Sequence, residues 1–177
     1  MDTELLAERC QDACADQTEA FGGQDIWKAY GRTGILARVG LYYVPRVLSL
    51  PEGLKEVAPR LFENSPVERL AVPSSVERLG GHAFFRCERL CEVVFQPDSR
   101  LERIGEYCFA GCSLRQLVVP RSVRQIGDFA FCECRDLCRV DLEPDSLLAY
   151  VGEFAFWLTS MDLQNIRRVT PGDQRQL

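Results

Sequence analysis

The stretch Leu79-Gly80-Gly81-His82-Ala83-Phe84 decides the fold, because three later stretches repeat its pattern. The shared pattern is an aliphatic residue, glycine, a variable residue, an aromatic residue or histidine, a small residue, and phenylalanine. The phenylalanine recurs at Phe84, Phe109, Phe131 and Phe156, at intervals of 25, 22 and 25 residues. A motif with this period is typical of a solenoid. The later copies are Ile104-Gly105-Glu106-Tyr107-Cys108-Phe109, Ile126-Gly127-Asp128-Phe129-Ala130-Phe131 and Val151-Gly152-Glu153-Phe154-Ala155-Phe156.

An earlier copy can be traced upstream of these four. The run from Leu50 to Val57 aligns with the run from Val72 to Leu79, and Phe62 takes the place of Phe84. The aliphatic residue of the motif then falls at positions 57, 79, 104, 126 and 151, so intervals of 22 and 25 alternate. This alternation predicts a doublet of 47 residues as the true unit. In addition, residues 36–40 resemble residues 148–152, which predicts a degenerate first repeat.

Each repeat also contains a short run in which apolar residues alternate, with a proline at or near its end. Such runs are typical of β-strands, and proline marks their ends. Strands one repeat apart must run parallel, with neighbours ~4.8 Å apart. We expect the glycine motif to turn the chain and a single helical turn to insert each phenylalanine into the core. The alternating pairs are Leu48/Leu50, Leu70/Val72, Val93/Phe95, Leu117/Val119 and Val140/Leu142.

The first residues of the chain follow a different pattern. Residues 3–21 carry apolar residues at helical spacing and end at Gly22-Gly23, which predicts an amphipathic helix. We expect it to cover one end of the stacked core, with a short further turn at 25–30. The predicted organisation is an N-terminal helical cap with the degenerate repeat over 1–45, the repeat array over 46–171 and a tail over 172–177.

Composition limits the partners and the compartment. The net charge is −5 and the pI about 5.0, so no positive field attracts the chain to nucleic acid. No apolar run approaches the roughly 20 residues of a membrane span, so we expect no membrane insertion. The sequence holds nine cysteines and shows no export signal, which favours a reduced, cytoplasmic protein. An extracellular surface location is the alternative, if an export signal precedes this sequence.

A family resemblance rests on the motif Ser75-Val76-x-x-Leu79-Gly80-x-x-Ala83-Phe84-x-x-Cys87-x-x-Leu90-x-x-Val93 and on its later copies, such as residues 104–112. On this motif, the chain resembles the BspA-like leucine-rich repeat family over roughly residues 46–171. The resemblance implies an α/β solenoid, a right-handed stack with a short parallel β-sheet. It also implies adhesion or protein binding, since members of that family are often surface proteins.

The cysteines are candidates for disulfides or a metal site. Cys87, Cys112 and Cys134 each lie three residues after the repeat phenylalanine, so they form a ladder along the solenoid. Residues that recur with the repeat are typical of core thiols, and we expect free, buried thiols. A disulfide between adjacent repeats, such as Cys87–Cys112, is open as an alternative, as is a metal site.

His82 and three carboxylates are the candidates for catalysis. His82 occupies the position of Tyr107, Phe129 and Phe154, so we interpret it as a substitute in an aromatic stack. Glu106, Asp128 and Glu153 form a carboxylate ladder directly before the expected helical turn, where capping explains them. An acid–base or calcium site on this ladder is the enzyme alternative. We predict neither an enzyme nor a cofactor.

The outward face of the strands is the predicted binding surface, because solenoids present extended surfaces to partners. Val94 and Val118 are apolar at outward positions, where β-propensity alone is an equal explanation. We therefore predict a non-catalytic protein–protein interaction module whose partner is another protein, with a fragment of a surface adhesion protein as the alternative. The predicted contact residues are Arg69, Ala71, Glu92, Val94, Gln116, Val118, Arg139 and Asp141.

Overall fold

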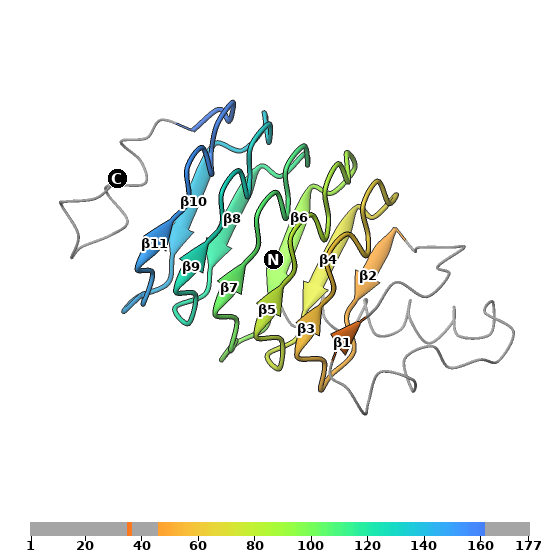
Figure 1. Ribbon diagram of the computed structural model, residues 1–177, viewed down its shortest axis with the longest axis vertical. Coiled ribbons are helices and arrows are strands. Elements are labelled where there is room, and N and C mark those ends of the chain that lie inside the picture. The colour runs from red at the N-terminus through yellow and green to blue at the C-terminus, as the bar shows by residue number, and fades with distance from the viewer. Residues whose placement is uncertain (1–34, 37–45, 162–177) are drawn as a thin grey trace, which may run out of the picture.

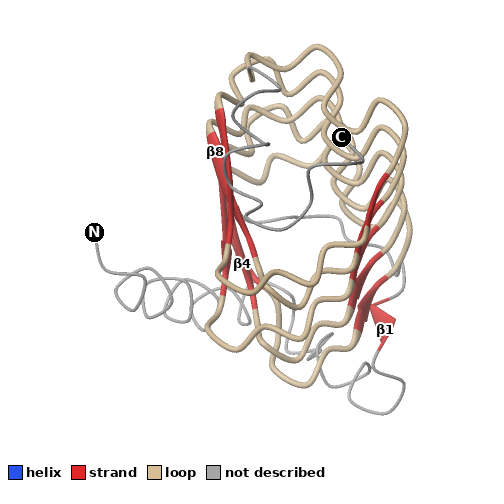
Figure 2. Ribbon diagram, turned by 90° about the vertical axis from the view of Figure 1, so that its left-hand side faces the viewer, coloured by secondary structure: helices blue, strands red, loops and turns tan. Residues whose placement is uncertain are grey.

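The computed structural model describes residues 35–36 and 46–161, which form a parallel β-solenoid. Each turn of the solenoid contributes two strands, one to each of two opposite sides of the molecule (Figures 1 and 2). The predicted N-terminal helix over 3–21, the turn at 25–30 and the tail over 172–177 lie outside the described residues. Within them, no residue is helical.

The predicted strands are confirmed, and they lie on one side of the solenoid. They form a three-stranded sheet in the order β2-β4-β6 and a two-stranded sheet of β8 and β10, all parallel. We call these two sheets together the divided sheet. Their bounds are β2 Val47–Ser49, β4 Arg69–Val72, β6 Glu92–Phe95, β8 Gln116–Val119 and β10 Arg139–Leu142.

The opposite side carries a second sheet, which the sequence did not predict. Two-residue strands at the aliphatic position of each repeat pair into one six-stranded parallel sheet, in the order β1-β3-β5-β7-β9-β11. The first strand of this sheet comes from the predicted degenerate repeat. Leu36 faces Val57, whereas the alignment of residues 36–40 with residues 148–152 would place Val39 opposite Val57. The bounds are β1 Ile35–Leu36, β3 Glu56–Val57, β5 Arg78–Leu79, β7 Arg103–Ile104, β9 Gln125–Ile126 and β11 Tyr150–Val151.

The repeat phenylalanines stack in the core between the two sheets. Phe62, Phe84, Phe109, Phe131 and Phe156 follow one another with ring centroids 5.2–5.4 Å apart. The first four rings are almost completely buried. Since each ring packs against the next repeat, no repeat buries its own apolar surface, and stacking supplies the stability.

The helical turn predicted around each phenylalanine is wrong. His82, Tyr107, Phe129 and Phe154 have φ between 51° and 58°, in the left-handed region that a right-handed helical turn excludes. Their conformation turns backbone N–H groups toward the next repeat. The N–H of His82 donates to the carbonyl of Glu106, and that of Phe84 to the carbonyl of Cys108. Hydrogen bonds to the next repeat therefore alternate with local turn bonds, such as that from the N–H of Ala83 to the carbonyl of Gly80, in place of the continuous bonds of a helix.

The motif glycine allows the repeats to approach closely. A Cβ atom at Gly105 would lie 2.6 Å from the backbone nitrogen of Gly81 in the preceding repeat. A Cβ atom at Gly80, Gly127 or Gly152 would likewise lie 2.4–2.6 Å from the nearest backbone atom of the preceding repeat. Glycine at these four places is therefore required by the spacing of the backbones, whereas the repeat of Phe62 has Ala58 there.

Candidate functional site: a groove in the divided sheet

A groove opens where the divided sheet is interrupted. β6 and β8 lie side by side in the stack (Figure 1) but share no hydrogen-bonded pairing. The space along this interruption is about 910 Å³. The residues that line it are Cys91, Glu92, Val93, Val94, Phe95, Pro97, Arg115, Gln116, Val118 and Glu143.

The interruption follows from the two repeat lengths. After its strand, the longer repeat runs six positions from Phe95 to Leu101, whereas the shorter repeat runs four from Val119 to Val123. The shorter turn lies between β4 and β6. These two strands pair at an offset of 23 residues, so that Leu70 faces Val93. Between β6 and β8 the longer turn intervenes, and the equivalent residues Val93 and Leu117 are 24 positions apart. Hydrogen-bonded pairing is lost there.

Four of the eight predicted contact residues line this groove: Glu92, Val94, Gln116 and Val118. Val118 is 50% exposed, so this apolar side chain of the groove stands in solvent. Ala71 was predicted to extend the apolar strip, which is wrong, since it is only 5% exposed. Arg139 and Asp141 lie on β10, outside the groove.

Ion pairs hold most of the charges around the groove. The Nε atom of Arg69 lies 3.4 Å from Oε2 of Glu92, and the Nε atom of Arg139 lies 2.6 Å from Oδ2 of Asp141. Glu143 accepts the backbone N–H of Arg121 at 2.9 Å. Among the residues that line the groove, the valines and Arg115, which is exposed and forms no ion pair within residues 46–161, are the groups left for a partner. The alternation of repeat lengths was the signal that could have located the six lining residues that sequence reasoning did not predict as contacts: Cys91, Val93, Phe95, Pro97, Arg115 and Glu143.

The cysteine ladder is a set of free thiols. Cys87, Cys112 and Cys134 are buried, and their thiols donate to the carbonyls of Phe62, Phe84 and Phe109. All seven cysteines in the described ranges are free. Burial raises the pKa of the Cys134 thiol to about 12 and that of Cys112 well above its ordinary value. Cys91 and Cys138 differ from the ladder because they are exposed.

His82 lies in an aromatic stack, as predicted. Its ring centroid is 4.8 Å from that of Tyr107, and the stack continues to Phe129 and Phe154 at 4.8 and 5.2 Å. No nucleophile or carboxylate hydrogen-bonds to the imidazole among the described residues. Across those same ranges no group of three His, Cys, Asp or Glu side chains is placed to hold a metal ion.

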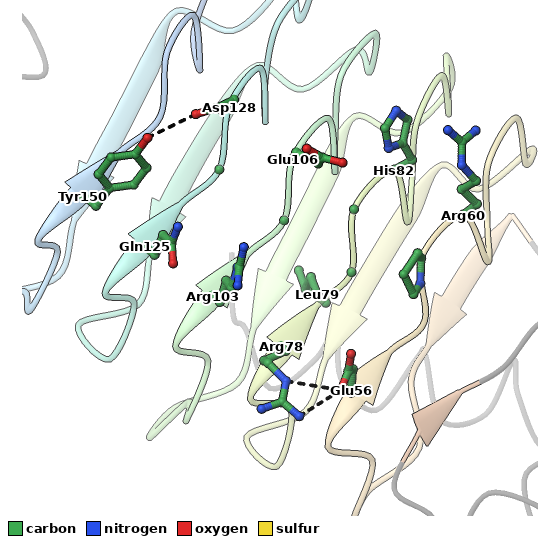
Figure 3. Close-up of a pocket in the computed structure, with 15 residues that line it drawn as sticks. Glu56, Arg60, Arg78, Leu79, His82, Arg103, Glu106, Gln125, Asp128 and Tyr150 are labelled. Atoms are coloured by element: carbon green, nitrogen blue, oxygen red, sulfur yellow. Dashed lines mark hydrogen bonds and ion pairs between the residues drawn. The ribbon is translucent and has the colours of Figure 1, made fainter.

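The carboxylate ladder borders a second depression, on the six-stranded sheet (Figure 3). We call it the trough; it has a volume of about 550 Å³. Glu106, Asp128 and Glu153 are all exposed, so they lack the burial that tunes catalytic carboxylates. They do not cap helices either, since no helix follows. Asp128 instead accepts the N–H of Glu153 at 3.0 Å and the hydroxyl of Tyr150 at 3.2 Å.

The family described as BspA type leucine-rich repeat region matches residues 55–170, in six copies. The chain belongs to this family. The BspA-type repeats explain the pairing of one glycine and one phenylalanine per turn, because the glycine sets the approach of the backbones and the phenylalanine fills the core. Among curated proteins, none matches the chain at a significant level.

The chain is similar to solved structures of bacterial proteins, and the fold is shared with the first of them. The pneumococcal vaccine antigen PcpA is 18% identical with a TM-score of 0.55; the match covers 66% of this chain and 40% of PcpA. A leucine-rich repeat protein from Bacteroides ovatus is 20% identical with a TM-score of 0.48, over 63% of this chain and 34% of that protein. The BspA-type chain thus spans well under half the length of either protein.

The part of the chain that the structure describes includes no helix long and apolar enough to cross a bilayer.

Proposed function

We propose that this BspA-type solenoid is a non-catalytic module that binds another protein through the divided sheet, with the groove between β6 and β8 as its anchor point. The single observation that supports the proposal is the half-exposed Val118 in a groove whose surrounding charges are mostly paired. Apolar side chains in a partly enclosed position, ringed by polar groups, are the arrangement that dominates binding energy at protein interfaces.

The two valines also lie on different sides of the interruption. Val94 is on β6 and Val118 is on β8. An apolar side chain of a partner that enters between them would contact both strands and exclude water from the groove. Burial of apolar area contributes about 25 cal/mol per Å². The charged pairs Arg69–Glu92 and Arg139–Asp141 would form the rim on either side.

A pull-down with the full chain against Val94→Glu/Val118→Glu tests this proposal. We expect the double variant to lose partners that the wild type captures, because two carboxylates would be desolvated in the complex. Leu147→Glu is the matched control, since Leu147 is 49% exposed but lies outside the groove. Identical partners for the wild type and the groove variant would exclude the groove as the anchor.

We further propose a reducing, cytoplasmic environment for the module, because free thiols persist where glutathione and thioredoxin keep them reduced. The alternative is a segment of a longer surface protein, an idea that membership of the BspA-type family supports. Detection of the chain on intact cells with an impermeant label would favour the surface protein, and labelling only after lysis would favour the cytoplasmic module.

A further inference from the structure

The trough on the six-stranded sheet has two unlike walls. Arg78, Arg103 and Gln125 stand on one wall, at the first position of neighbouring strands, and all present N–H donors (Figure 3). Glu106 and Asp128 stand on the other wall and present carboxylate acceptors. The two walls belong to the same repeats, and the motif glycines separate them.

The floor of the trough is backbone. Gly80, Gly105 and Gly127 line it, and a Cβ at any of them would point into the preceding repeat at 2.6 Å. No side chain therefore rises between the two walls. The close spacing of the repeats explains why these residues are glycines. As a consequence, the trough has no side chains along its floor. Tyr150 closes one end, where its hydroxyl donates to Asp128 at 3.2 Å.

Most charges that line the trough already have partners. Arg78 pairs with Glu56 at 2.9 Å and Arg60 pairs with Glu63 at 3.3 Å. Arg103 and Glu106 are different: both are exposed, and neither forms an ion pair within residues 46–161. They are three residues apart in one repeat, which puts their Cα atoms at most about 10 Å apart. One repeat thus holds a cation and an anion on opposite walls.

We propose that the trough binds an extended peptide segment in which an acidic residue is followed directly by a basic one. In an extended chain, successive side chains point to opposite sides. The acidic side chain would face Arg103, while the basic side chain would face Glu106, so each unpaired charge gains a partner. This site is on the opposite side of the solenoid from the groove and has different chemistry, so it is independent of the proposed function.

The trough disfavours other ligand classes. A polyanion would meet the carboxylates of Glu106 and Asp128. A sugar ring prefers the open face of an aromatic side chain, but His82, Tyr107 and Phe129 are stacked at 4.8 Å and cover each other, so Tyr150, at one end of the trough, is the open ring among its lining residues. An extended peptide presents side chains to both walls.

The test uses the full chain, isotopically labelled, and three blocked tetrapeptides: acetyl-Ser-Glu-Lys-Ser-amide and its Glu-Glu and Lys-Lys counterparts. We expect the Glu-Lys peptide to shift the amide resonances of Ile104, Gly105 and Gly127 saturably. Arg103→Gln and Glu106→Gln should each weaken this binding about two- to five-fold, as is usual for exposed ion pairs. Arg124→Gln, an exposed arginine outside the trough, should not.

Three results would overturn the proposal. They are no shift of these resonances by the Glu-Lys peptide, equal affinity of all three peptides, and equal affinity of the wild type and both trough variants. Because Val94→Glu/Val118→Glu leaves the trough intact, it should bind the Glu-Lys peptide like the wild type, and this keeps the test separate from that of the groove.

Discussion

The two sheets of this solenoid arise from the same repeats, yet one is continuous and the other is interrupted. The six-stranded sheet keeps one register from Leu79 through Ile104 to Ile126, although the repeats that link its strands differ in length by three residues. The divided sheet loses its pairing between β6 and β8. The extra residues of the longer repeats lie on either side of its strands. Length variation is therefore confined to one side of the molecule, and the groove lies there.

The largest expected effect concerns the thiols that both sheets enclose. Unfolded thiols lose their protons above roughly pH 8.5, whereas burial raises the pKa of Cys134 to about 12 and those of Cys108 and Cys112 well above the ordinary value. The unfolded state then binds fewer protons, so stability is complete below pH 8.5 and falls as pH rises. Where they are deprotonated in the unfolded state, these three thiols predict a loss of about 4 kcal/mol per pH unit, and Cys87, whose pKa burial also raises, adds to this loss.

Urea unfolding between pH 7 and 10.5 measures this slope. The sequence has only Lys28 and Lys55 as lysines, so few amines titrate in the same range. Cys134→Ala should reduce the slope by about 1.4 kcal/mol per pH unit, the contribution of one proton. A stability that is independent of pH across this range would show that the thiols are not buried in solution. At pH 7, among the cysteines of residues 46–161, labelling should reach Cys91 and Cys138 first, because they are exposed.

The next effect breaks the continuous sheet. Gly105→Ala should destabilise the protein by about 3 kcal/mol or more, because the new Cβ would overlap the backbone of Gly81 at 2.6 Å. Gly81→Ala is the matched control: its Cβ would meet the flexible side chain of Glu106 at 3.1 Å, so we expect a loss below about 1 kcal/mol. Thermal unfolding compares the two. Equal losses would mean that the repeats can separate without cost.

A smaller effect would repair the divided sheet. Deletion of Gln96 and Arg100 shortens the turn after β6 to the length of the turn from Val119 to Val123. We expect β8 to pair with β6 at the 22-residue offset seen between β2 and β4, with a gain of about 1 kcal/mol from the restored hydrogen bonds. The groove should close, and partner binding should be lost. Gln96→Ser/Arg100→Ser keeps the length and should change neither.

The sequence predicted the features that depend on the repeat itself. The strands at Leu70/Val72 and Leu117/Val119, the stacked phenylalanines and the place of His82 follow from residues that recur at one position, because stacked repeats bring equivalent residues together. It did not predict the six-stranded sheet, since two-residue strands have no periodicity to detect. The helical turn failed for a related reason, because hydrogen bonds to the next repeat decide the backbone there, and a local pattern does not reveal them.

The groove was predicted only in part. Val94 and Val118 stand out as apolar residues at outward positions, but Ala71 at the equivalent position is buried. The groove itself depends on which strands pair, and pairing depends on the lengths of turns that lie outside the strands. Arg103 and Glu106 escaped notice because each looks like an ordinary exposed charge, and only the fold shows the glycine floor between them.

The interruption can be tested most directly at two equivalent amides, those of Ala71 on β4 and Val118 on β8. Ala71 is paired with Ser49 of β2. The carbonyls of Arg115 and Val119 accept bonds from the β10 repeat, so alternation along the strand turns the N–H of Val118 toward β6, where no pairing exists. Amide hydrogen exchange should be at least about 100-fold faster at Val118 than at Ala71. Equal protection of the two amides would show that the divided sheet is continuous and would contradict the groove.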